Sequence, residues 1–201
     1  MIALPNECYY QIFNNPRLNH KNLFSCALVN RQWCRVIIPI LWSEPKRHFK
    51  DIRLIRIFLL TLNSEEQDLL ISFKINFPNY PKPLFEYTNY ITSVTYDLYN
   101  GVRNWLRYER YKIENELVNA VVGSLTEMFL RTSKNLKHLD FNDSICDPIL
   151  LDYLYENTTI TSMYIFTDFK SKAIGGLLKI LYKNFTLTSL TLSSVKFGFE
   201  G

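Results

Sequence analysis

The sequence has few of the residues that build metal sites, disulfide frameworks and catalytic centres. Its 201 residues include three histidines and four cysteines, and no two cysteines share the C-x-x-C spacing of zinc and redox motifs. The start of the chain has no basic leader with an apolar stretch, and the longest apolar run, Val36–Trp42, is too short to cross a bilayer. These absences favour reduced thiols and a protein of the cytosol, the nucleus or both.

Apolar residues and an uneven charge are what the chain does have. Hydrophobic residues make up 47% of it and aromatic residues 15%, enough to bury a core and to exclude overall disorder. The formal net charge of +4 is concentrated at the N-terminus: residues 1–60 hold nine Lys/Arg against three Asp/Glu, whereas the rest holds fourteen against sixteen. A basic N-terminal third favours an acidic partner, protein or nucleic acid, although a solvated basic surface explains the same count.

Residues 4–44 have the spacing of short helices. The first places Leu4, Cys8 and Ile12 on one face, with residues 9 and 13 adjacent, and it ends before Pro16. The second is predicted to open near Asn19 and to run to Trp33, and the apolar segment 36–42 is interrupted by its proline. Three short helices make only a small core, so we expect this block to be stabilised by something that it binds or packs on.

Residues 46–89 are predicted to be a helical linker. Asp51 is placed to cap a helix over residues 52–62, and residues 64–67 match a reciprocal capping box, Ser-Glu-Glu-Gln, ahead of another helix. Prolines 78, 81 and 83 predict an extended loop. A longer helix is predicted over residues 115–131.

An internal repeat occupies the C-terminal part. Three segments share the pattern L-x-x-L-x-L, at residues 136–141, 160–165 and 187–192, with starts 24 and 27 residues apart. A fainter copy, Ile91-x-x-Val94-x-Tyr96, lies 45 residues upstream of the first, which implies an insertion between them. Each segment is predicted to be a short strand whose alternating apolar residues point inward.

Helices are predicted to return between these strands. Asp147 and Pro148 form an N-cap followed by a first-turn proline, and Asp168 is placed to cap the next helix, which carries Gly175 and Gly176. The glycine pair predicts close packing between neighbouring repeats. Residues 197–201 follow the last strand like the entry to a further helix, so we expect a truncated solenoid or an end that a partner covers. The predicted fold class is α/β: a three-helix N-terminal segment followed by a short strand–helix solenoid.

The N-terminal helices carry an ordered set of residues that resembles a known family. The set is Leu4-Pro5, Glu7, Ile12-Phe13, Leu23, Val29-Asn30-Arg31-Gln32-Trp33 and Leu41-Trp42. It resembles the F-box pattern of a leading Leu-Pro-x-Glu, a Val-x-[Arg/Lys]-x-Trp centre and a closing Leu-Trp. Two departures bear on the detailed contacts: tyrosines stand at positions 9 and 10, where leucines are commoner, and NNPRLNHKN replaces the usual Leu-Pro turn.

The resemblance implies an adaptor and no chemistry of its own. F-box helices bind the Skp-type adaptor of a cullin–RING ubiquitin ligase, and other subunits transfer ubiquitin, so the family implies no catalytic residue, cofactor or metal. Carried onto this chain, the resemblance assigns adaptor contact to six residues: Leu4, Pro5, Ile12, Leu23, Val29 and Trp33.

The repeats resemble the leucine-rich repeats that often follow an F-box, and residues 184–193 resemble the ribonuclease-inhibitor-like subtype. The whole arrangement is similar to the F-box/leucine-rich-repeat families expanded in some fungi. It implies the substrate-recognition adaptor of an SCF-type (Skp–cullin–F-box) ubiquitin ligase, with an F-box-like domain at residues 1–45 and repeats at 90–201. Outward strand positions are the candidate target-binding residues: Lys137, His138, Asp140, Ser162, Tyr164, Ser189 and Thr191.

Catalysis and metal binding are weaker alternatives. None of the histidines at positions 20, 48 and 138 lies in a motif with a cysteine or carboxylate at ligand spacing, and no phosphate-binding glycine motif is present. Asp140, Asp143 and Asp147 lie close enough in sequence to suggest a cation site, but a strand-face position and a helix cap explain them more simply.

Two binding alternatives remain. Residues 46–56 and 103–110 combine basic and aromatic side chains, as single-strand nucleic-acid sites do, but neither matches a nucleic-acid motif. Trp33, Trp42 and Trp105 are predicted to be core residues instead. The other alternative is a leucine-rich-repeat interaction scaffold with no link to a ligase.

Overall fold

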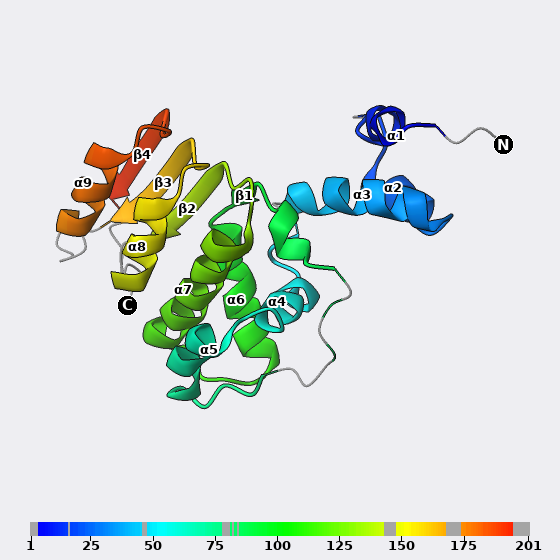
Figure 1. The fold of residues 1–201 in the computed structure, drawn as a ribbon. Helices are drawn as coiled ribbons and strands as arrows, with labels where there is room; N and C mark the ends of the chain where they lie inside the picture. The colour runs from blue at the N-terminus through cyan, green and yellow to red at the C-terminus, as the bar shows by residue number, and fades with distance from the viewer. Residues whose placement is uncertain are drawn as a thin grey trace.

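The computed structural model describes residues 4–15, 17–45, 48–77, 81, 83, 85–142, 148–167 and 174–194. Three N-terminal helices extend from a larger body, in which helices lie along one face of a four-stranded sheet (Figure 1). None of the described helices combines the length and the apolar character that a membrane crossing requires.

The N-terminal helices are α1 (Asn6–Phe13), α2 (His20–Ala27) and α3 (Arg31–Ser43). The side-chain oxygen of Asn19 accepts a hydrogen bond from Asn22 N at 2.9 Å and caps α2. In the same way, Asn30 accepts from Trp33 N at 2.8 Å and caps α3. The prediction of one helix from Asn19 to Trp33 is therefore wrong, because Asn30 begins a new helix.

The predicted interruption at Pro39 is also wrong, since α3 continues through it. An interior proline removes one helical hydrogen bond and costs about 3 kcal/mol. On the same helix, Ile37 and Leu41 are buried, 0% and 8% exposed. Burial of two such side chains offsets a cost of that size, at about 1.5–3 kcal/mol each.

The N-terminal helices bury a small core of their own, made of Phe13, Leu23, Ala27, Ile37 and Leu41. The Phe13 ring lies edge-on to Trp33, with ring centroids 5.0 Å apart. Helix α1 thus packs through Phe13 and its neighbour Tyr9, whereas the predicted stripe of residues 4, 8 and 12 is exposed.

Two helices follow, α4 (Ile52–Leu59) and α5 (Ser64–Ile71). Asp51 caps α4 as predicted, accepting from Arg53 N at 2.9 Å. The capping box of α5 lies one residue earlier than predicted, because Asn63, not Ser64, is the cap. Asn63 and Glu66 exchange two backbone-to-side-chain hydrogen bonds, both of 2.8 Å.

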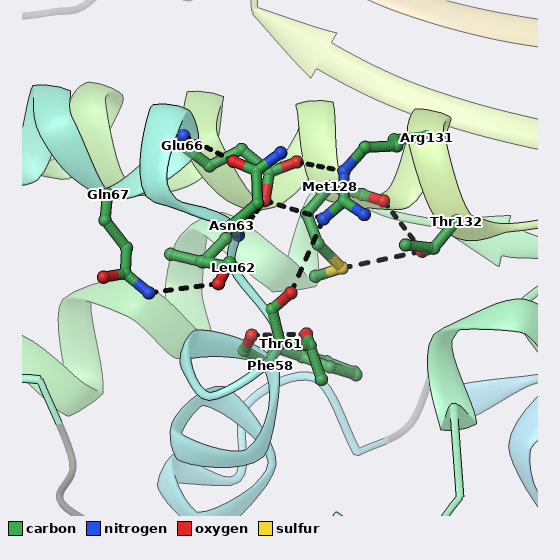
Figure 2. Close-up of polar contacts among 9 residues, drawn as sticks. All are labelled: Phe58, Thr61, Leu62, Asn63, Glu66, Gln67, Met128, Arg131 and Thr132. Atoms are coloured by element: carbon green, nitrogen blue, oxygen red, sulfur yellow. Dashed lines mark hydrogen bonds and ion pairs between the residues drawn. The ribbon is translucent and has the colours of Figure 1, made fainter. Parts of the chain in front are cut away.

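This shift places Glu66 against the long helix α7 (Asn115–Thr132) (Figure 2). Arg131 of α7 donates to both carboxylate oxygens of Glu66, at 2.7 and 2.9 Å. Glu66 is 3% exposed, so the paired and capped carboxylate joins α5 to α7 in the interior.

The sheet contains β1 (Ser93–Val94), β2 (His138–Asn142), β3 (Ser162–Thr167) and β4 (Ser189–Ser194), all parallel and in chain order. Its register pairs Ser93 with His138, His138 with Ser162, and Ser162 with Ser189. The aligned sequence segments are therefore neighbours in space, and each overlaps an observed strand, although the first strand is only two residues long.

The predicted insertion between the first two strands consists of α6 (Asp97–Tyr108) and α7. Helix α8 (Pro148–Glu156) begins at Pro148, as predicted, and α9 (Ile174–Lys183) precedes β4. The predicted caps Asp147 and Asp168, and the candidate ligand Asp143, lie outside the described residues. A side chain at Gly176 would meet Leu151 of α8 at 2.7 Å, whereas Gly175 faces open space, so only one glycine of the pair serves close packing.

One continuous core runs from Phe49 to Ile180. Helices α4 and α5 contribute to it: the rings of Phe58 and Phe129 meet edge to face, 4.8 Å between centroids. The N-terminal helices join this body where Trp42 stacks on Tyr87, in the short 3-10 helix η2 (Tyr87–Tyr90), at 4.2 Å. The predicted division at residues 45 and 89 stays a prediction, and helices α4 and α5 of the predicted linker pack as part of the body.

The inward residues of β4 are less covered than those of its neighbour. Leu190 and Leu192 are 40% and 50% exposed, whereas Met163 and Ile165 at the same register on β3 are 2% and 1% exposed. The described chain thus leaves the apolar face of β4 partly uncovered.

Candidate functional site

The N-terminal helices present an unusual number of apolar side chains to solvent. Six large apolar residues of this segment are at least 44% exposed: Leu4, Tyr10, Ile12, Phe24, Leu28 and Val29. Leu28 and Val29, at 72% and 61%, occupy the turn between α2 and α3. Surface apolar residues gathered on one small segment mark a binding surface.

Gln32, at the start of α3, forms hydrogen bonds with the residues at the start of α1. Its side-chain nitrogen donates to Leu4 O at 3.5 Å and to Asn6 Oδ1 at 3.3 Å. The start of α1 therefore lies beside the start of α3 and the exposed turn at Leu28 and Val29.

The six residues assigned to adaptor contact divide into two groups. Leu4, Pro5, Ile12 and Val29 are exposed and free to meet a partner. Leu23 is 8% exposed and Trp33 packs on Tyr9 and Phe13, so these two shape the surface from below. Their assignment stays a prediction.

Sequence reasoning missed three exposed residues, Tyr10, Phe24 and Leu28. Tyr10 was noted only as a departure from the family pattern. The signal for Phe24 and Leu28 was available: each lies off the apolar stripe of α2 that Leu23 and Ala27 define.

The same segment is basic. Arg17, Lys21, Arg31 and Arg35 are all exposed, and none forms an ion pair with another described residue. Unpaired cations around an apolar surface favour an acidic partner and faster association.

Residues 1–48 match the model of the F-box-like family. This segment is an F-box-like domain. Such domains bind Skp-type adaptors in cullin–RING ligases, which suggests an adaptor role for the chain. Searches of curated proteins and of solved structures found no match. The exposed apolar and basic surface just described belongs to the F-box-like domain.

A second surface lies on the sheet, on the face opposite the apolar core. The register aligns six of the predicted target-binding residues in two rows across β2, β3 and β4: His138, Ser162 and Ser189, then Asp140, Tyr164 and Thr191. Lys137, the seventh, is exposed just before β2. The structure thus brings together the residues that alternation predicted to face outward.

Three of these side chains touch in a line. His138 Nδ1 lies 3.2 Å from Ser162 Oγ, and His138 Nε2 lies 2.6 Å from Asp140 Oδ1. The other oxygen of Asp140 accepts from Tyr96 N at 3.1 Å. Sequence reasoning considered histidine–carboxylate pairs only at metal-ligand spacing and so missed the contact between His138 and Asp140, whose positions two apart on a strand share a face.

A serine, a histidine and an aspartate in contact have the composition of a hydrolytic triad, but the surroundings do not complete one. Catalysis at Ser162 would need backbone donors aimed at a developing oxyanion. The N–H groups of Thr161 and Ser162 instead donate to Lys137 O, at 2.9 and 3.0 Å. The described residues also contain no group of three side chains able to hold a metal ion.

Sequence reasoning missed the aromatic part of this face. Tyr96 was predicted to point inward, as the third apolar position of the faint repeat, and that prediction is wrong. Its backbone is already helical, because it caps α6, and its ring contacts Phe166 at 4.7 Å. Burial is the main cause that raises the pKa of Tyr96, and Tyr99 adds to it. Because every second residue of a strand points to the same face, the outward position of Tyr164 also predicts an outward position for Phe166.

Two aromatic rings of the stretches considered for nucleic acid belong to the buried core. Trp105 is 1% exposed and Phe49 is fully buried, so neither offers a ring for a base to stack on. Arg56 pairs with Glu109 at 2.6 Å.

Proposed function

We propose that the protein is the substrate-recognition adaptor of an SCF-type ubiquitin ligase, acting in the cytosol or nucleus. Its F-box-like domain binds a Skp-type adaptor, and its C-terminal strand–helix units, as leucine-rich repeats, hold the target protein. The observation that carries the proposal is the family match at residues 1–48, combined with the exposed apolar surface of the same segment.

The composition of this surface supports adaptor binding. Leu28 and Val29 form an apolar tip, and the start of α1 lies beside it through Gln32. Burying one such side chain fully is worth about 1.5–3 kcal/mol, so several together are sufficient for a stable complex.

Strand spacing supports the repeat half of the proposal. Consecutive strands β2, β3 and β4 pair in register at steps of 24 and 27 residues, each joined by one helix. One short strand and one helix per repeat of 20–29 residues is the pattern of leucine-rich repeats.

The test is co-expression of the full chain with a Skp-type adaptor. We expect a stable complex by size-exclusion chromatography and calorimetry. Val29→Asp and Ile12→Asp should each weaken it at least about tenfold, because a charge would have to be desolvated at the contact. Both residues are at least 50% exposed, so the fold should tolerate the change.

Ile149→Asp is the matched control. Ile149 is 56% exposed on α8, outside the F-box-like domain, so it tests the same chemical change on another surface. Absence of a wild-type complex, or equal weakening by all three variants, would refute the ligase role and leave the alternative of a repeat-based interaction scaffold.

A further inference from the structure

The outer face of the sheet carries a row of touching aromatic rings. Tyr164 contacts Phe166, Phe166 contacts Tyr96, and Tyr96 stacks on Tyr99, with centroid separations of 4.7, 4.7 and 5.3 Å. All four side chains are partly exposed. Tyrosine-rich aromatic surfaces are typical of protein-interaction sites.

The row already holds a cation at one end. The guanidinium of Arg103 lies over the Tyr99 ring, 5.9 Å from its centroid. Aromatic faces carry negative potential, so the remaining rings offer the same kind of contact to a cation from outside.

A carboxylate lies beside the rings. Asp140 is the one acidic residue among the outward positions of the described strands, which include no lysine or arginine. Its side chain is 15% exposed: Oδ1 is buried and lies 2.6 Å from His138 Nε2, whereas Oδ2 accepts a hydrogen bond from Tyr96 N at 3.1 Å. Two neighbouring hydroxyls, of Ser93 in β1 and of Thr95 just after it, are buried and have no hydrogen-bond partner within the described chain.

We propose that this face binds an arginine side chain presented by the target protein. The guanidinium stacks on Tyr164 and Phe166 and donates to Oδ2 of Asp140, which has a second lone pair beside the hydrogen bond from Tyr96 N. The proposal rests on the proposed function, since it names the chemistry of the target that the repeats would hold.

Arginine fits better than lysine for two reasons. Its flat guanidinium stacks on rings while keeping its N–H groups available in the plane, whereas an ammonium is a compact and strongly hydrated charge. Its fork of N–H donors can also bond to a carboxylate oxygen while the guanidinium plane stays stacked on a ring.

The test uses three probe peptides and the full chain. The peptides are acetyl-Gly-Ser-X-Ser-Gly-amide with X as arginine, lysine or citrulline, the uncharged analogue of arginine. Binding is followed by NMR shifts of the Tyr164 and Phe166 ring signals. We expect saturable shifts with the arginine peptide and at least roughly tenfold weaker binding of the citrulline peptide, because a charge-assisted hydrogen bond is lost.

Two variants and one control assign the site. Asp140→Asn keeps an oxygen for Tyr96 N and should weaken the arginine peptide roughly tenfold. Tyr164→Leu keeps an apolar strand residue and should weaken it several-fold by removing a ring face. Asp152→Asn, the same change at an exposed position on α8, should have no effect.

The outcomes separate this site from the ligase role. Wild-type chain that binds arginine and citrulline peptides equally, or neither, overturns the site even when its adaptor complex is intact. The site is supported if the chain binds the arginine peptide specifically and Asp140→Asn weakens that binding, whether or not the adaptor complex forms. Absence of the adaptor complex alone overturns only the proposed function.

Discussion

Gly101 of α6 should tolerate no side chain. A Cβ added there would overlap the carbonyl oxygen of Phe49 and lie 2.9 Å from its carbonyl carbon and 3.1 Å from Ile55 Cδ1. Phe49 cannot easily retreat: it is fully buried, and its N–H donates to Pro45 O at 3.2 Å in the turn after the F-box-like domain. The glycine therefore permits a close approach of helix to backbone.

The two effects of Gly101→Ala have opposite signs. Alanine stabilises a helix interior by about 1 kcal/mol relative to glycine. Overpacking costs about 1–3 kcal/mol, and the upper end applies here because the obstacle is backbone. We expect a net loss of about 2 kcal/mol in the free energy of unfolding, measured from the urea midpoint and slope.

Two glycines of α9 serve as matched controls. A Cβ at Gly176 meets only the movable tip of Leu151, at 2.7 Å, so Gly176→Ala should be nearly neutral. Gly175 has nothing within 4 Å, so Gly175→Ala should gain up to about 1 kcal/mol. If Gly101→Ala is as stable as wild type, the close packing of α6 on the turn is refuted.

The strands were predictable because two independent signals agree on them. The repeated L-x-x-L-x-L pattern marks positions such as Leu139 and Met163, and alternation then assigns the residues between them to the outer face. Both signals depend only on spacing, which is why the sequence alignment coincides with the register of the sheet.

Helix boundaries were less predictable, because single side-chain contacts decide them. Asn30 ends one apolar run and caps the next helix. Asn63, not Ser64, caps α5, and this position of the cap brings Glu66 into contact with Arg131. That last contact spans 65 residues of sequence, so no local pattern contains it.

The candidate surfaces were also only partly predictable from the sequence. Family resemblance predicted which F-box-like residues matter, but only the packing shows that Leu23 and Trp33 lie beneath the surface and that Leu28 is exposed. On the sheet, alternation found Asp140 and Tyr164, whereas Tyr96 reaches the same face from the start of a helix.

Two further predictions concern charge. Glu66→Gln should lower the free energy of unfolding by about 2 kcal/mol in urea titrations. This loss is smaller than that of a fully buried ion pair, because the Arg131 side chain keeps some access to water. An unchanged urea midpoint would refute a stabilising role for the pair. The second prediction concerns pH. His20 is exposed, but partial desolvation of its ring, and then the His48 ring with its centroid 5.0 Å away, lower the pKa of His20, and a backbone hydrogen bond at Leu41 partly opposes them. The unfolded chain therefore takes up this proton more readily, so stability falls as the pH drops from the ordinary value of 6.5 towards the lower folded pKa. From about pH 7 to about pH 5.5, the thermal midpoint of the wild type should fall further than that of His20→Asn, and equal losses would show that His20 contributes nothing to the pH dependence.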